Sequence, residues 1–568
     1  MSPHIVLQNI DHTRRMAKSN QSVNTVALVC GADDQAVLKT LFDRHSSDIF
    51  NVDGSTKILV FEERLGSKTR QGNFLGALLA YRRLKEQAAG IQNRVILMGM
   101  VFGRGERISP FSQIHGNRKT LIRAASPQIE LQVQPLTSIE EAMRHFAPLA
   151  AALEQGGFRG ILCKWGDETQ IPSVPLEKLS FGNFSLSDVI KCVAQIPVTD
   201  ESASQKDWVV FDGADAKMIA QLSRNSQGVL LKEMGSWTSK YPKAQAGVSL
   251  GPVAVSNRVL ELALEIFHPE IERGGVVLDF DPFVIQALGF DADETLWNAE
   301  VEKSPGLQAV VRLIPDFFAR IQELKKKFAA RYGRPLIVEV LDLGADLYWA
   351  DVGQHRAFAE KVFAVNEQSP RGEIARELEE IFGSRDARGN LIIDSVIAPS
   401  VDVFNSVIIH SVISGSGIIA GSVIKNSLLH DVKINKGFVL HSARVSVTME
   451  ENSGLYEALG TSAVTVKTNE RLGTLLTEEG PKDLRVCETT DLRKRGENYD
   501  RPIFDNALSF ERAFVIMQTI PAQTLQQRRR RARADVIEGV VERLFALFQS
   551  GVLTEERLNL ALTIIHHQ

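Results

Sequence analysis

Cysteine, net charge and long apolar runs are all scarce in this sequence, and each shortage excludes a class of protein. The four cysteines, Cys30, Cys163, Cys192 and Cys487, are too few and too scattered for a disulfide framework or a CxxC metal site. They are predicted to be core thiols in a reducing compartment. The 65 basic and 69 acidic residues give a formal net charge of −4, so no overall field attracts nucleic acid or anionic membranes.

Apolar residues never run together for the roughly 18 positions that a membrane helix needs, and the N-terminus holds no apolar stretch of signal-peptide length. We therefore expect a cytoplasmic protein that binds neither membrane nor nucleic acid. What is present is an ordinary globular composition, 44% apolar and 24% charged, which excludes global disorder, collagen-like repeats and coiled-coil rods. At about 150 residues per domain, the length predicts three or four domains.

The first half of the chain has the pattern of an α/β protein. From Asn24 to about Leu343, short apolar runs rich in β-branched residues alternate with longer segments of helical period. This alternation is typical of a sheet covered by helices on both faces. The expected strands are TVALVC, KILVF, RVILMGMVF, GILCKW, WVVF and PLIVEVL.

The pattern changes near Gly389. From Leu391 to Val447 there is no helical period, and aliphatic residues return every five or six positions. Such a repeat favours a parallel β-helix, in which stacked coils bury a column of aliphatic side chains, and the segment has room for about three coils of 18 residues. An antiparallel sandwich is the alternative, but it needs strict alternation and turn signals about every 8 to 12 residues.

The C-terminal region is predicted to be a small helical module. After Met449 the repeat fades, and beyond Pro521 the segments DVIEGVVERLFALFQSG and TEERLNLALTII have the pattern of two amphipathic helices joined at Gly551. A basic run, Arg528 to Arg531 plus Arg533, precedes them. We interpret it as the solvated start of a helix, with phosphate or RNA binding as the alternative.

The most informative segment is VILMGMVFGRGERISPFSQIHGNRKTLI. Here an apolar strand runs into a loop that contains Gly103, Gly105, Arg107 and Lys119. Glycines let backbone N–H groups approach a polyphosphate closely, and fixed cations offset its charge. The dinucleotide fingerprint GxGxxG is absent because its last position is Ile108. The loop therefore predicts phosphate binding of another kind.

A second segment, FRGILCKWGDETQIP, is an apolar strand that ends in Gly166-Asp167. A carboxylate at the carboxyl end of a sheet strand is well placed to hold a divalent cation beside a phosphate. A strand that ends in Gly-Asp is also frequent in α/β proteins of other kinds, so this segment indicates metal binding only together with other motifs in the chain.

A third segment, DLYWADVGQHRAFAEKVFAVN, completes a series. In order, the three segments resemble the motifs G-x-G-T-R-x-x-P-x-T…K, strand-Gly-Asp and W-x-D-V-G-T…A-N of the sugar-1-phosphate nucleotidyltransferases, or NDP-sugar pyrophosphorylases. The chain resembles the members of this family that carry a C-terminal left-handed β-helix and is similar to ADP-glucose pyrophosphorylase-like enzymes. In the third motif Trp349, Asp351 and Gly353 match. Glu106 and Gln354 stand where the family has threonine.

The resemblance implies a particular fold. It is an α/β, Rossmann-like nucleotidyltransferase domain of GT-A type, followed by a left-handed parallel β-helix of hexapeptide repeats and a small α-helical module. The expected boundaries are an N-terminal α/β segment over 1–95, the catalytic domain over 96–385, the β-helix over 386–450, and an extension with a helical tail over 451–568. The β-helix also implies a homo-oligomer.

The resemblance further implies a Mg²⁺-dependent reaction of a nucleoside triphosphate with a sugar 1-phosphate, giving an NDP-sugar and pyrophosphate. Asp167 and Asp351 would be the catalytic carboxylates that hold the magnesium ion. Arg107, with the amides of Gly103 and Gly105, would hold the triphosphate. Lys119 would stabilise charge on the α-phosphoryl group. Neither the sugar nor the base can be identified from the sequence.

Weaker matches extend the resemblance toward the sugar. QAGVSLGPVAVSNRVLEL resembles the family's N-A-G segment, with Gln245 in place of Asn and Gly247 as the glycine near the sugar. LLKEMG places Lys232 and Glu233 where the family has Glu-Lys-Pro, in inverted order. VLDFDPFVIQAL resembles the stretch that follows the N-A-G segment.

The order of one unit departs from the family. NTVALVCGADDQAVLKTLF and KILVFEERLGSKTRQGNFLGALLAYRRL resemble the strand-helix-strand and Gly-Thr segment that approach the base, but here they precede the Gly-rich loop instead of following it. One hypothesis is a permuted catalytic domain in which Gln71, Gly72 and Gly76 bind the nucleotide. The alternative is an unrelated N-terminal α/β extension.

Two other functions stay open. One is a catalytically inactive regulatory or assembly subunit, since some subunits of translation initiation's guanine-nucleotide exchange factor combine a nucleotidyltransferase-like domain, a β-helix and a helical tail. The substitutions within the motifs keep this alternative open. The other is an acyltransferase in the β-helix, because His410, His430 and His441 lie in or beside the coils and a histidine can act as a general base.

Overall fold

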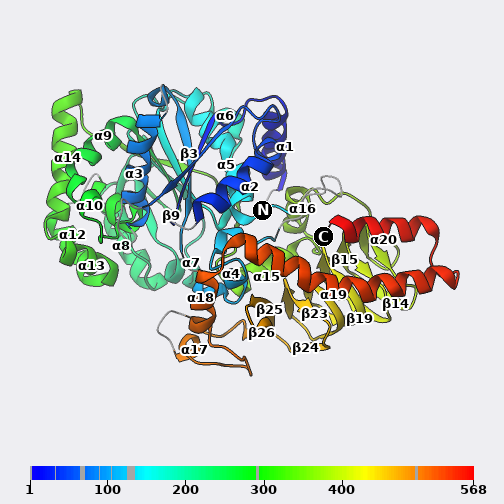
Figure 1. Ribbon diagram of the computed structural model, residues 1–568. Coiled ribbons are helices and arrows are strands. Elements are labelled where there is room, and N and C mark those ends of the chain that lie inside the picture. Colours follow the sequence, from blue (N-terminus) through cyan, green and yellow to red (C-terminus); the bar gives the residue numbers. More distant parts are fainter. Residues whose placement is uncertain are drawn as a thin grey trace. The chain divides into compact units, whose positions relative to one another are not determined.

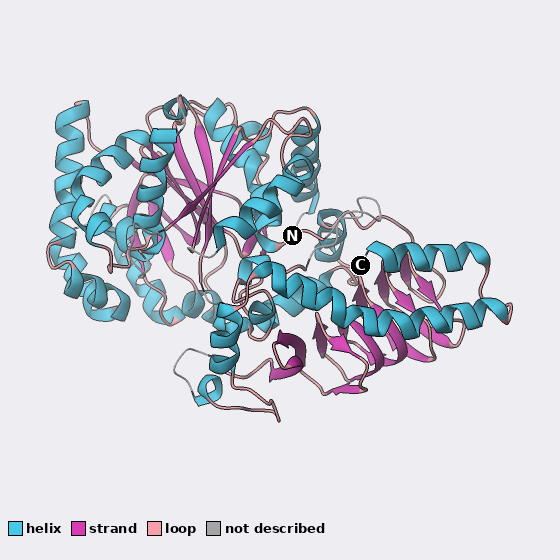
Figure 2. Ribbon diagram, in the orientation of Figure 1, coloured by secondary structure: helices cyan, strands magenta, loops and turns pink. Residues whose placement is uncertain are grey.

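The computed structural model describes residues 3–31, 34–63, 71–87, 90–103, 105–124, 135–289, 293–492 and 497–567. The protein is mixed α/β and contains parallel sheets (Figures 1 and 2). Its chain divides into two compact units. The first comprises Met1–Phe102, Ala142–Gly166 and Gln170–Trp349, and the second comprises Gly103–Glu141, Asp167–Thr169 and Ala350–Gln568.

One mostly parallel sheet forms the centre of the first unit. Its strands pair in the order β2, β1, β3, β4, β9, β6, β10, and the β7–β8 pair joins it through β9. β9 is antiparallel to its neighbours β4 and β6. The strands are β1 (Thr25–Cys30), β2 (Lys57–Glu62), β3 (Val95–Val101), β4 (Gly160–Trp165), β6 (Val189–Ala194), β7 (Trp208–Asp212), β8 (Met218–Leu222), β9 (Ala244–Ser256) and β10 (Val338–Asp342).

The N-terminal strand-helix-strand belongs to this sheet. β1 lies between β2 and β3, with Leu28 opposite Val60 on one side and Gly99 on the other, all in parallel register. Helix α2 (Gln35–Ile49) is the crossover between β1 and β2. The segment over 1–95 therefore shares a sheet with the strand that leads into the Gly-rich loop, and β3 itself begins at Val95.

Helices cover the sheet because its strands are apolar on both faces, as buried parallel strands are. Leu78 of α3, Leu260 of α9 and Ile321 of α14 share one core with Met98 of β3. The helices are α1 (Pro3–Lys18), α3 (Gly72–Gln87), α5 (Ser138–Gln155), α6 (Leu176–Leu179), α7 (Asp200–Gln205), α8 (Gln227–Lys240), α9 (Asn257–Ile266), α10 (His268–Arg273), α11 (Ile285–Leu288), α12 (Glu294–Lys303), α13 (Pro305–Leu313) and α14 (Phe317–Tyr332), with the short helices η2 (Ile91–Asn93) and η5 (Phe280–Val284).

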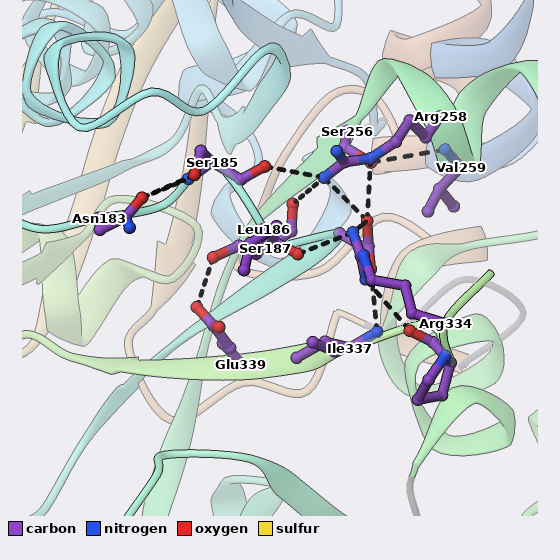
Figure 3. A network of polar contacts seen from close by, with 12 residues as sticks. Asn183, Ser185, Leu186, Ser187, Ser256, Arg258, Val259, Arg334, Ile337 and Glu339 are labelled. Atoms are coloured by element: carbon purple, nitrogen blue, oxygen red, sulfur yellow. Dashed lines mark hydrogen bonds and ion pairs between the residues drawn. The ribbon is translucent and has the colours of Figure 1, made fainter. Parts of the chain in front are cut away.

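A buried carboxylate fastens the β6–β10 edge of the sheet. Asp188, directly before β6, accepts hydrogen bonds from Arg258 Nε (3.1 Å) and Arg334 Nη1 (2.6 Å). It also accepts one from the backbone amide of Ile337 (3.0 Å). Arg258 and Arg334 converge on this network from different segments (Figure 3). The paired charges compensate the burial of the carboxylate and hold β6, α9 and the entrance to β10 together.

The second unit contains a stack of parallel strands, here called the strand stack, from β12 to β25. Leu391 pairs with Val407, Val407 with Val423 and Val423 with Phe438 in parallel register. Successive partners are thus separated by 15 or 16 residues along the chain, a shorter step than the expected 18. Parallel pairing of this kind excludes the antiparallel sandwich.

The strand stack continues past residue 450, where the sequence placed its end. Gly454 pairs with Arg471, and only β26 turns back to pair antiparallel with β25. The strands are β12 (Leu391–Ile393), β13 (Val396–Ile397), β14 (Val401–Phe404), β15 (Val407–Ile409), β16 (Val412–Ile413), β17 (Gly417–Ala420), β18 (Val423–Lys425), β19 (Leu428–Asn435), β20 (Phe438–Leu440), β21 (Ala443–Met449), β22 (Gly454–Tyr456), β23 (Leu459–Gly460), β24 (Val464–Val466), β25 (Glu470–Thr477) and β26 (Gly480–Cys487).

Polar residues hold the corners of the strand stack. One corner has a residue with positive φ in successive repeats, and these residues are Asp394, His410, Asn426, His441 and Glu457. A serine follows in four of the five repeats and builds a ladder. Ser411 N donates to Ser395 Oγ (3.1 Å), and Ser427 N donates to Ser411 Oγ (3.1 Å). The aliphatic period alone does not reveal this ladder.

The C-terminal helices pack on the strand stack. Val536 and Val540 of α19 share a core with Val412 and Leu428. The two predicted helices are present, although the first of them begins earlier, at Ala522. The helices are α15 (His355–Ala364), α16 (Pro370–Leu378), α17 (Glu497–Asp500), α18 (Phe510–Thr519), α19 (Ala522–Gln549) and α20 (Glu555–His567). Within the described ranges, no helix combines the length and apolarity needed to cross a bilayer.

The arginine run is not a uniformly solvated helix start. Arg528 donates to Leu476 O (3.0 Å) and Arg533 to His441 O (2.7 Å), while Arg529 forms an ion pair with Glu457 (3.0 Å). Only Arg530 and Arg531 are exposed. The expected solvated face is therefore corrected: three of the five guanidinium groups bind the strand stack, because the helical period turns them toward it.

Candidate phosphate and metal site

The four predicted catalytic residues come from separate loops of the second unit. Arg107 lies in the short helix η3 (Glu106–Ile108) and Lys119 in η4 (Lys119–Leu121), on either side of α4 (Phe111–Ile114). Asp167 directly precedes β5 (Glu168–Ile171), and Asp351 ends β11 (Tyr348–Asp351). β5 and β11 pair as a two-stranded sheet, which brings the two aspartates to neighbouring chain segments.

Lys119 and Asp167 form a shielded ion pair. Lys119 Nζ donates a hydrogen bond to Asp167 Oδ2, and the two side chains are only 17% and 9% exposed. Burial opposes the lysine cation, but Asp167 and then Asp351 outweigh it and raise the pKa of Lys119. The lysine therefore remains a cation that is held against a carboxylate.

Gly353 marks the point on which the charged groups converge. A Cβ on this glycine would lie 2.9 Å from Asp351 Oδ1, 3.4 Å from Asp167 Oδ2 and 3.6 Å from Arg107 Nη2. The Gly353 amide donates to Asp351 Oδ1 (2.6 Å). Burial and the nearby charge of Asp167 raise the pKa of Asp351. Two carboxylates thus share one small space that glycine keeps open.

The two glycines of the loop make room for the lysine. Gly103 has φ +100°, and a Cβ there would lie 3.0 Å from Lys119 Cε. Gly105 has φ +63°, and its Cβ would lie 2.8 Å from Lys119 Cβ and 2.7 Å from Ser112 Cβ. Both positions need glycine for their backbone conformation and for this close approach. From the sequence, we interpreted these glycines as allowing a phosphate to approach the backbone. The structure shows that they also allow Lys119 to pack against the loop.

Asp167 and Asp351 have the chemistry of a magnesium site completed by substrate. Mg²⁺ is commonly bound by one or two carboxylates together with phosphate oxygens and water. Among the described residues, no group of three or more His, Cys, Asp and Glu side chains is arranged to hold a metal ion. A magnesium ion held by these two carboxylates would take its other ligands from phosphate and water.

Sequence reasoning missed the residues that join the loops to one another. His355 Nε2–H donates to Ser109 O (2.7 Å), and its ring lies edge-on against Phe111 at 4.9 Å. Ser112 Oγ–H donates to Gly105 O (2.8 Å). These contacts fasten the Gly-rich loop to the segment that carries Asp351. The only sequence signal was the position of His355 within the third motif.

The C-terminal region holds the loop that leads to Lys119. Asn117 Nδ2 donates to Phe514 O of α18 (2.9 Å), and Arg529 of α19 donates to Ile114 O (2.9 Å). Tyr456 Oη accepts a hydrogen bond from Arg123 N (2.9 Å). Helices α18 and α19 and the strand stack therefore fix both ends of the lysine-bearing segment.

The predicted nucleotide residues of the first unit pack against protein. Gln71 is 1% exposed and donates through Nε2 to Ile271 O (3.0 Å). A Cβ on Gly72, which has φ +78°, would lie 2.6 Å from Leu278 O. Gly76 is buried inside α3, where a Cβ would lie 3.6 Å from Val29 Cγ1. Their role toward a base stays a prediction.

The predicted sugar residues also lie in the first unit. Gly247 is buried in β9, where a Cβ would lie 3.0 Å from Val193 Cγ2. Lys232 and Glu233 are on α8: Lys232 is exposed, and Glu233 forms an ion pair with Lys303 (2.9 Å). Close packing between strands therefore explains why position 247 is a glycine. Within the described residues, no contact joins Gly247 to Lys232.

The three histidines of the strand stack each contact a different partner. Burial lowers the pKa of His441 to about 3, and its Nε2 contacts Arg123 O at 3.2 Å. His410 lies 3.4 Å from Asp394. His430 Nδ1 lies 3.0 Å from Ser414 Oγ. Because these partners lie along different parts of the stack, the arrangement favours corner-holding roles over acyl transfer.

No protein-family model matches this chain, and a search of curated proteins finds no match. A functional assignment therefore rests on the geometry of the site and on the resemblance of the motifs.

Proposed function

We propose that this protein is a Mg²⁺-dependent nucleotidyltransferase that joins a nucleoside triphosphate and a sugar 1-phosphate to give an NDP-sugar and pyrophosphate. The observation that carries the proposal is the convergence at Gly353 of Asp167, Asp351 and Arg107, with Lys119 paired to Asp167. Three segments far apart in the sequence, around Arg107 and Lys119, Asp167 and Asp351, supply two cations and two carboxylates to one place. This is the charge pattern that phosphoryl transfer needs.

Each side chain has a role that follows from its position. Arg107 is exposed at the edge of the site, where its guanidinium can bind triphosphate oxygens in a bidentate way. Lys119 is more shielded and is held beside Asp167. In the proposal its Nζ would stabilise charge on the α-phosphoryl group. The backbone amides of Gly103 and Gly105 would bind the phosphates.

Asp167 and Asp351 would hold the magnesium ion. When bound, the ion would neutralise charge on the reacting phosphates. Asp167 would then bind the ion in place of Lys119, and Lys119 would be available to a phosphate oxygen. In the reaction an oxygen of the sugar phosphate attacks the α-phosphorus, the bond to the β-phosphate oxygen breaks and pyrophosphate leaves. No protein nucleophile is needed.

The fold supports the same proposal. The sheet has a single antiparallel strand, β9, in its central path, and the Gly-rich loop follows the buried strand β3. We interpret this arrangement as a Rossmann-like GT-A domain and the strand stack as a left-handed β-helix of hexapeptide type. The pairing of β1 with β3 supports a permuted catalytic domain over an unrelated N-terminal extension. A homo-oligomer built on the strand stack is part of the proposal.

One observation favours a second function. Asp167 is already neutralised by Lys119, and Glu106, Gln245 and Gln354 depart from the family motifs. A site that remains closed in this way suits a catalytically inactive regulatory or assembly subunit. In that case the contacts of α18 and α19 with the loop would serve assembly.

A pyrophosphate-release assay distinguishes the two functions. The full chain is incubated with Mg²⁺, each of the four nucleoside triphosphates and a panel of sugar 1-phosphates, beside the variants Asp167→Asn and Asp351→Asn. Asp215→Asn, on the exposed turn between β7 and β8, is the matched control. Release that needs one triphosphate and one sugar, and that either site variant abolishes, supports the enzyme. No release from any pair by the folded protein favours the regulatory subunit.

A further inference from the structure

A second candidate site lies wholly inside the first unit. Strand β8 and helices α8, α11 and α12 enclose a cavity of about 180 Å³. Its walls include two glutamines, two tryptophans and a small group of charged side chains. The residues that matter to the argument are Gln221, Gln286, Trp237, Trp297, Glu233 and Lys303.

The two glutamines lack the partners that buried amides require. Gln221 is 3% exposed and Gln286 is 7% exposed. Within the part of the chain that the structure describes, neither the Nε2 nor the Oε1 atom of either residue has a hydrogen-bond partner. Buried amides are almost always hydrogen-bonded, because an unpaired donor or acceptor has lost its water without compensation. Two such amides among the lining residues give the cavity unpaired donors and acceptors for a polar ligand.

Aromatic rings give the cavity rigid apolar walls. Trp297 is 5% exposed and stacks on Phe318 with ring centroids 5.5 Å apart. Trp237 stacks on Tyr241 at 6.3 Å. Because each indole is held by its own neighbour, the walls are formed before any ligand arrives. Preformed apolar walls with a few convergent polar groups are the usual composition of a small-molecule site.

The charge at the cavity disfavours an anion. Lys303 Nζ forms ion pairs with Glu233 (2.9 Å) and Glu300 (2.8 Å). The group therefore carries one more carboxylate than cations. A phosphate or carboxylate ligand would meet a negative excess in a partly desolvated place, whereas an uncharged ligand would not. The occupant is thus expected to be neutral.

The volume matches one six-membered ring, since a cavity of about 150 Å³ holds benzene. A hydroxyl group both donates and accepts hydrogen bonds, so neighbouring hydroxyls can pair with both the N–H and the C=O of a glutamine amide. The C–H face of a sugar ring packs well against indole. We propose that this cavity binds the ring of an uncharged pyranose sugar, at a site separate from the four charged residues around Gly353.

Binding can be measured without nucleotide or Mg²⁺, so the result does not depend on nucleotidyl transfer. The full chain is titrated with glucose, galactose and mannose, with their 1-phosphates, and with adenosine and guanosine. Tryptophan fluorescence and calorimetry are the readouts. We expect saturable binding of at least one free hexose, with a change in tryptophan emission, and at least tenfold weaker binding of its 1-phosphate at this site.

Variants locate the site. Gln286→Leu and, separately, Gln221→Leu should weaken hexose binding at least tenfold, while Gln205→Leu on the exposed end of α7 should leave it unchanged. If Gln286→Leu does not fold, Gln221→Leu carries the test. The proposal is overturned if no free hexose saturates at about 10 mM, if a nucleoside binds in preference, or if both glutamine variants bind sugar as tightly as the wild type.

Discussion

Lys119 donates a hydrogen bond to Asp167 across 48 positions of sequence, and helix α5 lies between them along the chain. Lys119 follows β3 and Asp167 follows β4, two neighbouring parallel strands. Loops that leave the carboxyl ends of neighbouring parallel strands emerge at the same edge of the sheet. This topology makes a lysine-aspartate pair possible here, and the pair in turn holds the cation and the carboxylate side by side.

Removing the lysine should separate its catalytic role from its structural one. Lys119→Met is expected to lower the kcat of nucleotidyl transfer by about 10²–10³, the usual cost of losing one group that stabilises transition-state charge. It should also lower the melting temperature, because Asp167 loses its partner in a shielded place. The double variant Lys119→Met with Asp167→Asn should recover stability but not activity. A single variant with wild-type kcat would contradict the assigned role.

Gly353→Ala tests whether the open space between the carboxylates matters. The added Cβ would lie 2.9 Å from Asp351 Oδ1, closer than real Cβ atoms approach oxygen, so the carboxylate must move. We expect at least tenfold lower activity with the overall fold retained. Gly539→Ala in α19 is the control, because a Cβ there meets nothing within 4 Å. Equal activity of the two variants would show that the carboxylates tolerate displacement.

Arg529 and Arg530 are adjacent on α19 but should respond differently to substitution. Burial opposes the negative charge of Glu457, but the guanidinium of Arg529 outweighs it and holds the pKa of Glu457 at about 2. Arg529→Met removes the nearest cation from that buried carboxylate, which is expected to cost up to about 3–5 kcal/mol in the free energy of unfolding. Arg530→Met, at an exposed position, should change it by less than about 0.5 kcal/mol. Urea unfolding of both variants measures the difference.

The same comparison extends to activity. Arg529 also donates to Ile114 O, close to the segment that carries Lys119. Arg529→Met should therefore lower kcat at temperatures where the protein remains folded, and Arg530→Met should not. If both variants retain full kcat, α19 stabilises the fold without positioning the lysine.

Two buried histidines should make the protein sensitive to acid. Burial lowers the pKa of His355 to about 3 and that of His441 to about 3, against an ordinary value of 6.5. Between pH 6.5 and 3 the unfolded chain binds more protons at these sites than the folded one. Stability should therefore fall as the pH decreases through this range, by about 1.4 kcal/mol per pH unit for each histidine once the pH is well below 6.5.

Unfolding free energies measured from pH 7 to pH 4 check this slope. Replacement of His355 by Gln, which does not titrate, should lower stability at pH 7 through the weakened contact with Ser109. It should also flatten the dependence on pH. A variant whose slope equals that of the wild type would show that His355 is not a source of acid sensitivity.

Much of the secondary structure was accessible from sequence because it repeats locally. Apolar runs such as TVALVC and RVILMGMVF predicted buried parallel strands, and the structure contains them as β1 and β3. The regular spacing of aliphatic residues after Gly389 predicted stacked parallel strands. The predicted coil of 18 residues was longer than the observed step of 15 or 16, and the predicted end at residue 450 was too early. β26 turns back on β25 through a two-residue turn between Thr477 and Gly480, and an aliphatic period typical of parallel coils does not predict such a hairpin.

Sequence by itself determined which residues carry charge and which strands precede them, and three motifs in order were enough to select Arg107, Lys119, Asp167 and Asp351. Tertiary structure alone decided that Lys119 pairs with Asp167, that His355 holds Ser109, and that Arg529 faces inward while Arg530 does not. The physical reason is the separation along the sequence over which each kind of interaction acts. Periodicity and turn chemistry act over a few residues, whereas the partner of a charge is set by which distant loops the sheet and the strand stack bring together.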